Sequence, residues 1–146
     1  NDAVVHGIPS DKFFTDKDVV SVDCGVILNG FYGDAAFSFA FKNVGLGVEN
    51  LLRVTRESLY KGIEAVVVGN RIGDISYAIQ NYCEKVHGYG IVRELVGHGV
   101  GRSLHEDPEV PNFGMKGKGT LLKEGIVIAI EPMDHSYKRW KTFGSL

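Results

Sequence analysis

Cysteine is scarce in this sequence: only Cys24 and Cys83 occur among 146 residues, too few for a disulfide framework, which favours a reducing, intracellular setting. No apolar run approaches the roughly 20 residues that a membrane-spanning helix requires, so no membrane partner is expected. Lysine and arginine are not clustered, and the net charge of -2 disfavours nucleic acid as a partner. The chain starts at Asn1, inside an apolar segment. We therefore expect part of a longer protein, located in the cytoplasm, or in an organelle if a presequence was removed.

What the chain does contain is an ordinary globular composition. Hydrophobic residues make up 44% and charged residues 23%, which is enough apolar material for one core and too little charge for a disordered chain. We therefore interpret residues 1–146 as a single domain. Cys24 falls in a predicted strand and Cys83 on the apolar side of a predicted helix, so both are expected to be structural rather than nucleophilic.

A β-hairpin is predicted over residues 18–41. Asn29-Gly30 is the preferred dipeptide of a two-residue type I′ turn, and it places Gly25 opposite Asp34. One face of the hairpin is small and polar and carries Asp23 and Asp34. The other face is apolar and is expected to pack on helices; it consists of Val22, Cys24, Val26, Leu28, Ala35, Phe37, Phe39 and Phe41.

Two helices are predicted after the hairpin, over residues 48–67 and 75–86. Asp74 can cap the second helix, and Gly88 sits just past its end. Residues 91–96 and 125–132 are predicted to be strands. The order of a hairpin, two helices, a strand, a glycine-rich loop and a strand predicts an α+β fold with a mostly antiparallel sheet. The expected buried stripe of the first helix is Val48, Leu51, Leu52, Leu59, Ile63 and Val66.

The two aspartates of the hairpin are the first candidate site residues. In the predicted register Asp23 and Asp34 are diagonal neighbours, roughly 7–8 Å apart at the backbone. Carboxylates that close disfavour each other's charge unless a cation lies between them. The alternative is a pair of unrelated surface aspartates, and geometry alone does not decide between the two.

Glu131 ends the apolar run of residues 126–130, directly before Pro132. An ionised carboxylate at the end of a buried strand is costly unless it is paired or binds a metal ion. The alternative is a glutamate that emerges into solvent where the strand stops. Alone, this residue is therefore a weak indication of a site.

Two histidines, His98 and His105, flank a run of alternate glycines. Gly97 and Gly99 carry no side chain that would block a close approach, and the loop can bend so that both imidazoles face one cavity. Imidazole together with carboxylates suits Zn, Mn, Fe or Co. A lone histidine is more often a hydrogen-bonded structural residue, but His6, in "VVHGIP", adds a third histidine to this set.

With these residues assembled, the chain resembles the type I methionine aminopeptidases, metallopeptidases of the pita-bread fold. The matching segments are "NDAVVHGIP", "VDCGVILNGFYGDAAFSF", "GHGVGRSLHEDPEV" and "IEPM". The resemblance implies a partial catalytic domain with a curved, largely antiparallel sheet covered by helices. Aminopeptidase P and prolidase share this fold, but they typically continue the glutamate motif as Glu-Pro-Gly, whereas this chain has Met133 after Pro132.

The resemblance also implies roles for the candidate residues. Asp23, Asp34, His98 and Glu131 occupy metal-ligand positions for two divalent ions (Co, Mn, Fe, Zn or Ni). Glu131 is additionally implied as a general base, and His105 and His6 as contacts to the substrate's scissile carbonyl and peptide nitrogen. The implied reaction is removal of the N-terminal methionine from nascent chains and peptides by hydroxide that the ions generate. The family norm is a monomer.

Three departures from the family pattern alter the expectation. The family has a second, metal-bridging glutamate on a later strand, and no glutamate follows Met133 here. The family's N-terminal segment is also missing before Asn1, and Leu104 stands where an aromatic residue is frequent. We therefore expect this stretch alone to be weakly active or inactive. A non-catalytic pita-bread module that binds peptides or proteins, and an Xaa-Pro peptidase, are the alternative functions.

Overall fold

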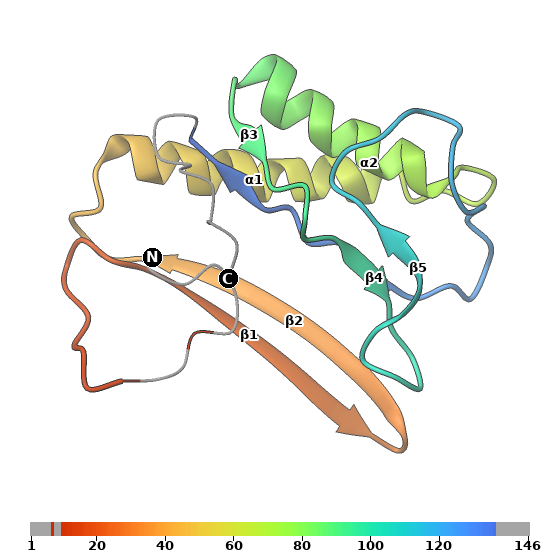
Figure 1. The fold of residues 1–146 in the computed structure, drawn as a ribbon, viewed down its shortest axis with the longest axis horizontal. Helices are drawn as coiled ribbons and strands as arrows, with labels where there is room; N and C mark the ends of the chain where they lie inside the picture. Colours follow the sequence, from red (N-terminus) through yellow and green to blue (C-terminus); the bar gives the residue numbers. More distant parts are fainter. Residues whose placement is uncertain (1–6, 8–9, 137–146) are drawn as a thin grey trace.

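The computed structural model describes residue 7 and residues 10–136, in which a long hairpin is followed by two helices and then by short strands (Figure 1). His6 lies outside the described residues. The two helices lie side by side, and the strands are antiparallel, so the predicted α+β class is confirmed. No helix in residues 10–136 combines the length and apolar character needed to cross a bilayer.

The hairpin consists of β1, Val19–Leu28, and β2, Phe31–Ala40. Asn29 (φ 52°) and Gly30 (φ 79°) both adopt the left-handed conformation that a type I′ turn requires. The pairing is the predicted one throughout, with Asp23 opposite Ala36 and Gly25 opposite Asp34, and no bulge interrupts it. The Asn-Gly turn thus fixes the register that sets both aspartates on one face.

The expected packing of the hairpin's apolar face on helices is wrong for the described residues. Val22, Val26, Phe37 and Phe39 are each more than half exposed, and Leu28 is 73% exposed. Within residues 10–136 the two strands form a sheet with each other alone, and the helices direct their buried sides toward the short strands instead. The apolar face is therefore left open.

The first predicted helix is α1, Leu46–Glu64. Its buried residues are Val54, Ser58 and Gly62, so the predicted stripe is displaced from the observed one. A Cβ atom at Gly62 would lie 3.0 Å from Ile79, which shows how closely the next helix approaches. Small residues such as Gly62 allow the two helices to approach closely, and the pattern of hydrophobic residues does not predict such a contact.

The second predicted helix is α2, Ile72–Gln80, continued by the π-helix η1, Asn81–Val86. It starts earlier than predicted, because Asp74 acts from the third helical position: its carboxylate accepts a hydrogen bond from the Arg71 N–H at 2.8 Å. Gly88 (φ 68°) follows the end of η1, as predicted.

The predicted strands are shorter in the structure. Residues 91–96 reduce to β3, Gly90–Ile91, which pairs with β7, Asp134–His135. Residues 125–132 reduce to β6, Ile128–Ala129. A three-stranded sheet has the order β5-β4-β6, where β4 is Gly97–Gly99 and β5 is Glu106–Val110. His98 therefore lies on a strand with neighbours on both sides, and not in the loop that was predicted.

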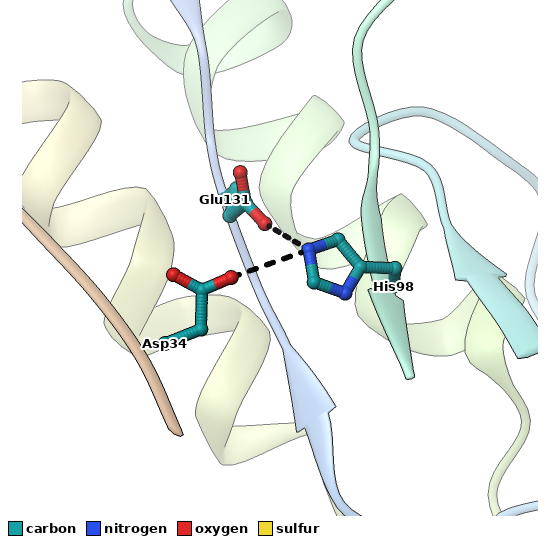
Figure 2. A group of neighbouring side chains, drawn as sticks. All are labelled: Asp34, His98 and Glu131. Atoms are coloured by element: carbon teal, nitrogen blue, oxygen red, sulfur yellow. Dashed lines mark ion pairs between the residues drawn. The ribbon is translucent and has the colours of Figure 1, made fainter. Parts of the chain in front are cut away.

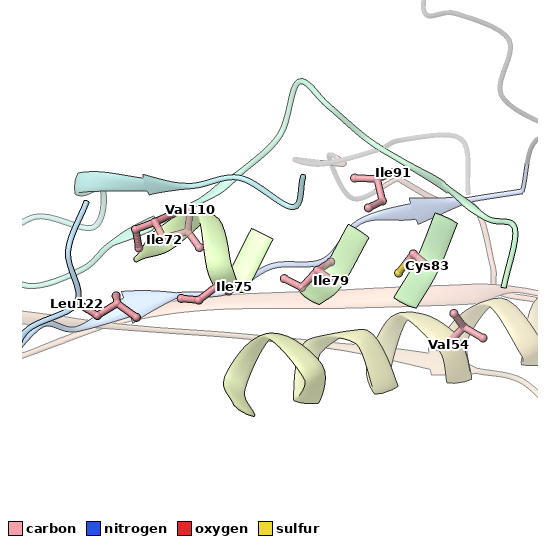
Figure 3. Close-up of a cluster of buried hydrophobic side chains, with 8 residues drawn as sticks. All are labelled: Val54, Ile72, Ile75, Ile79, Cys83, Ile91, Val110 and Leu122. Carbon is pink, nitrogen blue, oxygen red and sulfur yellow. The ribbon is translucent and has the colours of Figure 1, made fainter. Parts of the chain in front are cut away.

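The core lies between the two helices and the short strands (Figure 3). Fully burying one aliphatic side chain stabilises a fold by about 1.5–3 kcal/mol, so this cluster anchors the strands that carry the site. Cys83 is buried in it, which agrees with its predicted structural role, whereas Cys24 is exposed. The cluster comprises Val54, Ile72, Ile75, Ile79, Cys83, Ile91, Val110 and Leu122.

Candidate metal centre

Three predicted site residues, distant in the sequence, converge at one point (Figure 2). Asp34 comes from β2, His98 from β4 and Glu131 from the segment after β6. The His98 Nε2 atom lies 3.1 Å from Glu131 Oε1 and 3.5 Å from Asp34 Oδ2. One potential ligand atom from each residue lies within 4.8 Å of the other two. The arrangement therefore presents an imidazole nitrogen and two carboxylate oxygens to a common centre.

His98 offers one particular ring nitrogen to the site. Nδ1 lies 2.8 Å from the carbonyl oxygen of Gly99. A carbonyl only accepts hydrogen bonds, so Nδ1 donates this one, and Nε2 is the nitrogen that faces the carboxylates. Nε2 and one oxygen from each carboxylate form a ligand set that suits a divalent cation.

Glu131 supports this interpretation. Its Oε1 atom is buried and has no hydrogen-bond partner among the described residues, so the 3.1 Å approach of His98 is a contact without a hydrogen bond. Burial raises the pKa of Glu131, and the charges of Asp34 and Asp23 raise it further, while His98 and His105 act in the opposite direction. A bound divalent cation would offset both the burial and the repulsion, so these residues fit a metal ion.

Close backbone contacts around β4 bring His98 to this point. A Cβ atom at Gly97 would collide with the carbonyl oxygen of Ala129 in β6, and one at Gly99 with that of Asp107 in β5. Glycine is the residue that admits neighbouring backbones at such a distance. The predicted reason for these two glycines is therefore confirmed, although they serve a strand rather than a loop.

The hairpin is attached to the same region near its turn. The Tyr32 N–H donates to the carbonyl oxygen of Gly101 at 2.7 Å, two residues before Asp34. On the paired strand β1, a Cβ atom at Gly25 would lie 3.4 Å from the side chain of Leu104. The chain between the two histidines thus holds the carboxylate-bearing face of the hairpin in place.

His105 lies beside the group without belonging to it. Its ring centroid is 4.3 Å from that of His98, in an edge-to-face arrangement. The loop before it is closed by Glu106, whose Oε1 accepts a hydrogen bond from the Ser103 N–H at 2.6 Å. The second imidazole is therefore available to a molecule bound at the centre.

Asp23 occupies the same hairpin face as Asp34, one step along the register, but it is exposed and is not one of the three converging ligands. It is near enough for its charge to act on Glu131. The structure thus brings together Asp34, His98 and Glu131, places His105 and Asp23 at the edge of the group, and does not describe His6.

Sequence reasoning missed one polar residue beside the site. Asn112 is completely buried, and its Nδ2 donates to the backbone carbonyl oxygen of Glu131 at 2.7 Å. The signal available was an asparagine directly after Pro111, but such residues are common in turns. Its role depends on a contact between distant segments, which no local pattern reports.

Comparison with known proteins agrees with this geometry. The model of metallopeptidase family M24 matches residues 1–144. The chain belongs to this family. Metallopeptidases use a metal ion for hydrolysis, so the divalent metal use inferred from the ligand set is a property of the family. Which ion is bound, and how many, is not fixed by this membership.

Among curated relatives, the methionine aminopeptidase of Clostridium acetobutylicum is 53% identical over 134 residues, which cover 91% of this chain and 53% of that protein. Methionine aminopeptidase 1 of Bacillus subtilis is 46% identical over 140 residues, or 96% of this chain and 56% of that protein. The chain therefore spans about half the length of the curated relatives it matches.

Solved structures confirm the fold. The crystal structure of methionine aminopeptidase from Thermotoga maritima matches 90% of this chain and 53% of its own, with a TM-score of 0.86 and 48% identity. Prolidase from Pyrococcus furiosus matches 88% of this chain and 37% of its own, with a TM-score of 0.76 and 28% identity. The predicted pita-bread architecture is thus confirmed, and the likeness is greater to the aminopeptidase than to the prolidase.

Proposed function

We propose that the protein removes the N-terminal methionine from peptides and nascent chains as a metal-dependent exopeptidase. The convergence of Asp34, His98 and Glu131 is the observation that carries this proposal. Support comes from relatives named methionine aminopeptidase, which are 53% and 46% identical to this chain over the matched residues. A cytoplasmic, monomeric protein would suit this function.

In this proposal Asp23, Asp34, His98 and Glu131 would hold two divalent ions. Asp34, His98 and Glu131 already converge, and Asp23 lies on the same hairpin face as Asp34. When bound, the ions supply a nucleophilic water at neutral pH and polarise the scissile carbonyl. Co, Mn, Fe, Zn and Ni all accept carboxylate and imidazole ligands, so the donor set leaves the metal open.

The remaining roles fall to the protein's own side chains. Glu131 takes the proton of the attacking water at a carboxylate oxygen. His105, beside His98, donates to the carbonyl oxygen of the substrate and stabilises the charge that develops there. His6 contacts the peptide nitrogen beyond the methionine.

The test is metal binding measured together with peptide cleavage. The purified chain is stripped with a chelator, titrated with Mn²⁺ or Co²⁺ by calorimetry, and then incubated with a Met-Gly peptide and an Xaa-Pro peptide. We expect cation binding, and release of free methionine that the chelator abolishes.

Each alternative predicts a different result. An Xaa-Pro peptidase would cleave the proline peptide in preference to the methionine peptide. A non-catalytic module would bind the peptide and release no methionine at any metal concentration. Cation binding without any methionine release would therefore leave the metal centre standing and overturn the peptidase assignment for this chain.

A further inference from the structure

We propose that Asn112 is a positioning residue that holds Glu131 at the metal centre. This inference rests on the proposed metal site and adds a residue to it. Asn112 follows β5 by two residues, and Glu131 follows β6 by two, so both lie beyond regular strands. The side chain of Asn112 is completely buried, and its Nδ2 donates to the Glu131 carbonyl oxygen at 2.7 Å.

The backbone around Glu131 has few other means of support. In the β5-β4-β6 sheet, the ladder of β6 ends at Ala129, which pairs with His98. Pro132 has no N–H to donate. The next described backbone hydrogen bond is from the Val92 N–H to the Met133 carbonyl oxygen, at 2.9 Å. Among the described residues, the side-chain amide of Asn112 is thus the group that holds the Glu131 carbonyl between the end of β6 and Met133.

The contact also joins the two outer strands. β5 and β6 lie on opposite sides of β4, and β4 begins only at Gly97, which pairs with Val110. Past Gly97, β4 no longer lies between the segment after β5 and the segment after β6. Asn112, in the first segment, donates directly to Glu131, in the second, at a point where β4 provides no backbone hydrogen bond.

The amide orientation is fixed by its partner. If the amide were turned over, Oδ1 would face the carbonyl oxygen of Glu131, and two acceptors would be in contact. With Nδ2 as the donor, Oδ1 is buried and has no hydrogen-bond partner within residues 10–136. An unpaired buried acceptor is costly, about 1–3 kcal/mol, so the position is better suited to holding Glu131 than to stabilising the core.

The experiment compares metal affinity in four proteins: the wild type, Asn112→Leu, Asn112→His and Ser76→Ala. Leucine matches asparagine in shape but lacks the donor, whereas the histidine Nδ1 stands at the same distance along the side chain as Nδ2 and can donate. Ser76→Ala is the matched control, because Ser76 is also buried and its hydroxyl donates to a backbone carbonyl, that of Ile72, away from the site. Thermal unfolding is measured for each protein without metal.

We expect Asn112→Leu to bind Mn²⁺ about tenfold more weakly than the wild type, the lower end for partners that orient metal ligands. Ser76→Ala should lower the melting temperature and leave the Mn²⁺ affinity unchanged. Asn112→His should keep most of the affinity that Asn112→Leu loses. Wild-type affinity in Asn112→Leu, or an equal loss of affinity in Ser76→Ala, would overturn the proposal. If leucine prevents folding, Asn112→Ala, which adds no volume, takes its place. A wild-type protein that binds no cation would contradict the metal centre itself.

Discussion

The Nε2 atom of His98 lies 3.1 Å from Oε1 of Glu131, although one residue sits within a strand and the other follows the end of a different strand. Because Nδ1 of His98 is held by the Gly99 carbonyl, Nε2 is the nitrogen that faces the Glu131 carboxylate. A nitrogen and an oxygen placed in this way can serve as ligands to one cation.

Mn²⁺ should stabilise the wild-type protein, and His98→Ala should abolish the effect. At one hundred times the dissociation constant, a ligand that binds only the folded state adds about 2.7 kcal/mol to the free energy of unfolding. Thermal unfolding with and without the ion measures this. His87→Ala is the control, since His87 packs on Tyr82 with ring centroids 4.6 Å apart, outside the metal centre. An unchanged metal response in His98→Ala would remove His98 from the ligand set.

His105→Ala should reduce turnover of a Met-Gly peptide by about 10² to 10³, the usual loss for a donor that stabilises a developing oxyanion. Its metal affinity should stay within a few-fold of the wild type, because His105 touches the His98 ring without joining the three converging ligands. Steady-state kinetics and calorimetry on the same samples separate the two effects. A loss of metal affinity as large as that of His98→Ala would instead make His105 a ligand.

Gly97→Ala should weaken metal binding and lower stability together. The new Cβ atom would collide with the Ala129 carbonyl oxygen, so β4 and β6 must separate and His98 moves relative to Glu131. Overpacking of this kind costs about 1–3 kcal/mol. Gly47→Ala is the control, because no atom lies within 4 Å of its Cβ position. Gly97→Ala should lower both the stability in urea and the Mn²⁺ affinity. Gly47→Ala, at a helical position, should leave the affinity unchanged and should not lower the stability. Equal losses in both variants would contradict the proposed effect of the strand contact.

Asp134→Asn should make the metal-free protein more stable at neutral pH. Burial raises the pKa of Asp134 above the ordinary value of 3.8, against hydrogen bonds from Cys83 and Thr55 that lower it. The folded protein therefore holds this proton more tightly than the unfolded chain does, so stability is lost as pH rises through the raised pKa. Asparagine carries no titrating group and can still accept the hydrogen bond from Cys83.

Urea unfolding between pH 4 and pH 8 measures the difference. The wild type should lose stability with rising pH relative to Asp134→Asn, and the two should converge toward the acid end of the range. Asp11→Asn, which removes an exposed carboxylate, is the control. Parallel curves for the wild type and Asp134→Asn would show that the buried carboxyl does not titrate differently on folding.

The hairpin could be predicted because local chemistry decides it. Asn29-Gly30 fixes the turn, the turn fixes the register, and the register sets Asp23 and Asp34 on one face. The predicted convergence of Asp34, His98 and Glu131 came from the family resemblance, and the structure brings these three together. The metal-binding roles of Asp23, Asp34, His98 and Glu131, and the substrate contacts of His105 and His6, stay predictions.

The errors have a common physical origin in packing between segments. The buried side of α1 is lined by Ser58 and Gly62, because a close approach to α2 needs small residues rather than apolar ones. The open apolar face of the hairpin, and the buried contact of Asn112 with Glu131, also depend on which segments become neighbours in space. Periodicity within a segment carries no information on any of these.

The hydrogen bond between Tyr32 and Gly101 has a mechanical consequence. It lies at the turn end of the hairpin, while the opposite end, near Val19 and Ala40, is roughly 20 Å from Asp34 at the rise of an extended strand. Any bending of the long arms would therefore pivot about a point two residues from the carboxylate. A displacement at the far end would be much smaller at Asp34, so the distance between Asp34 and His98 would change little.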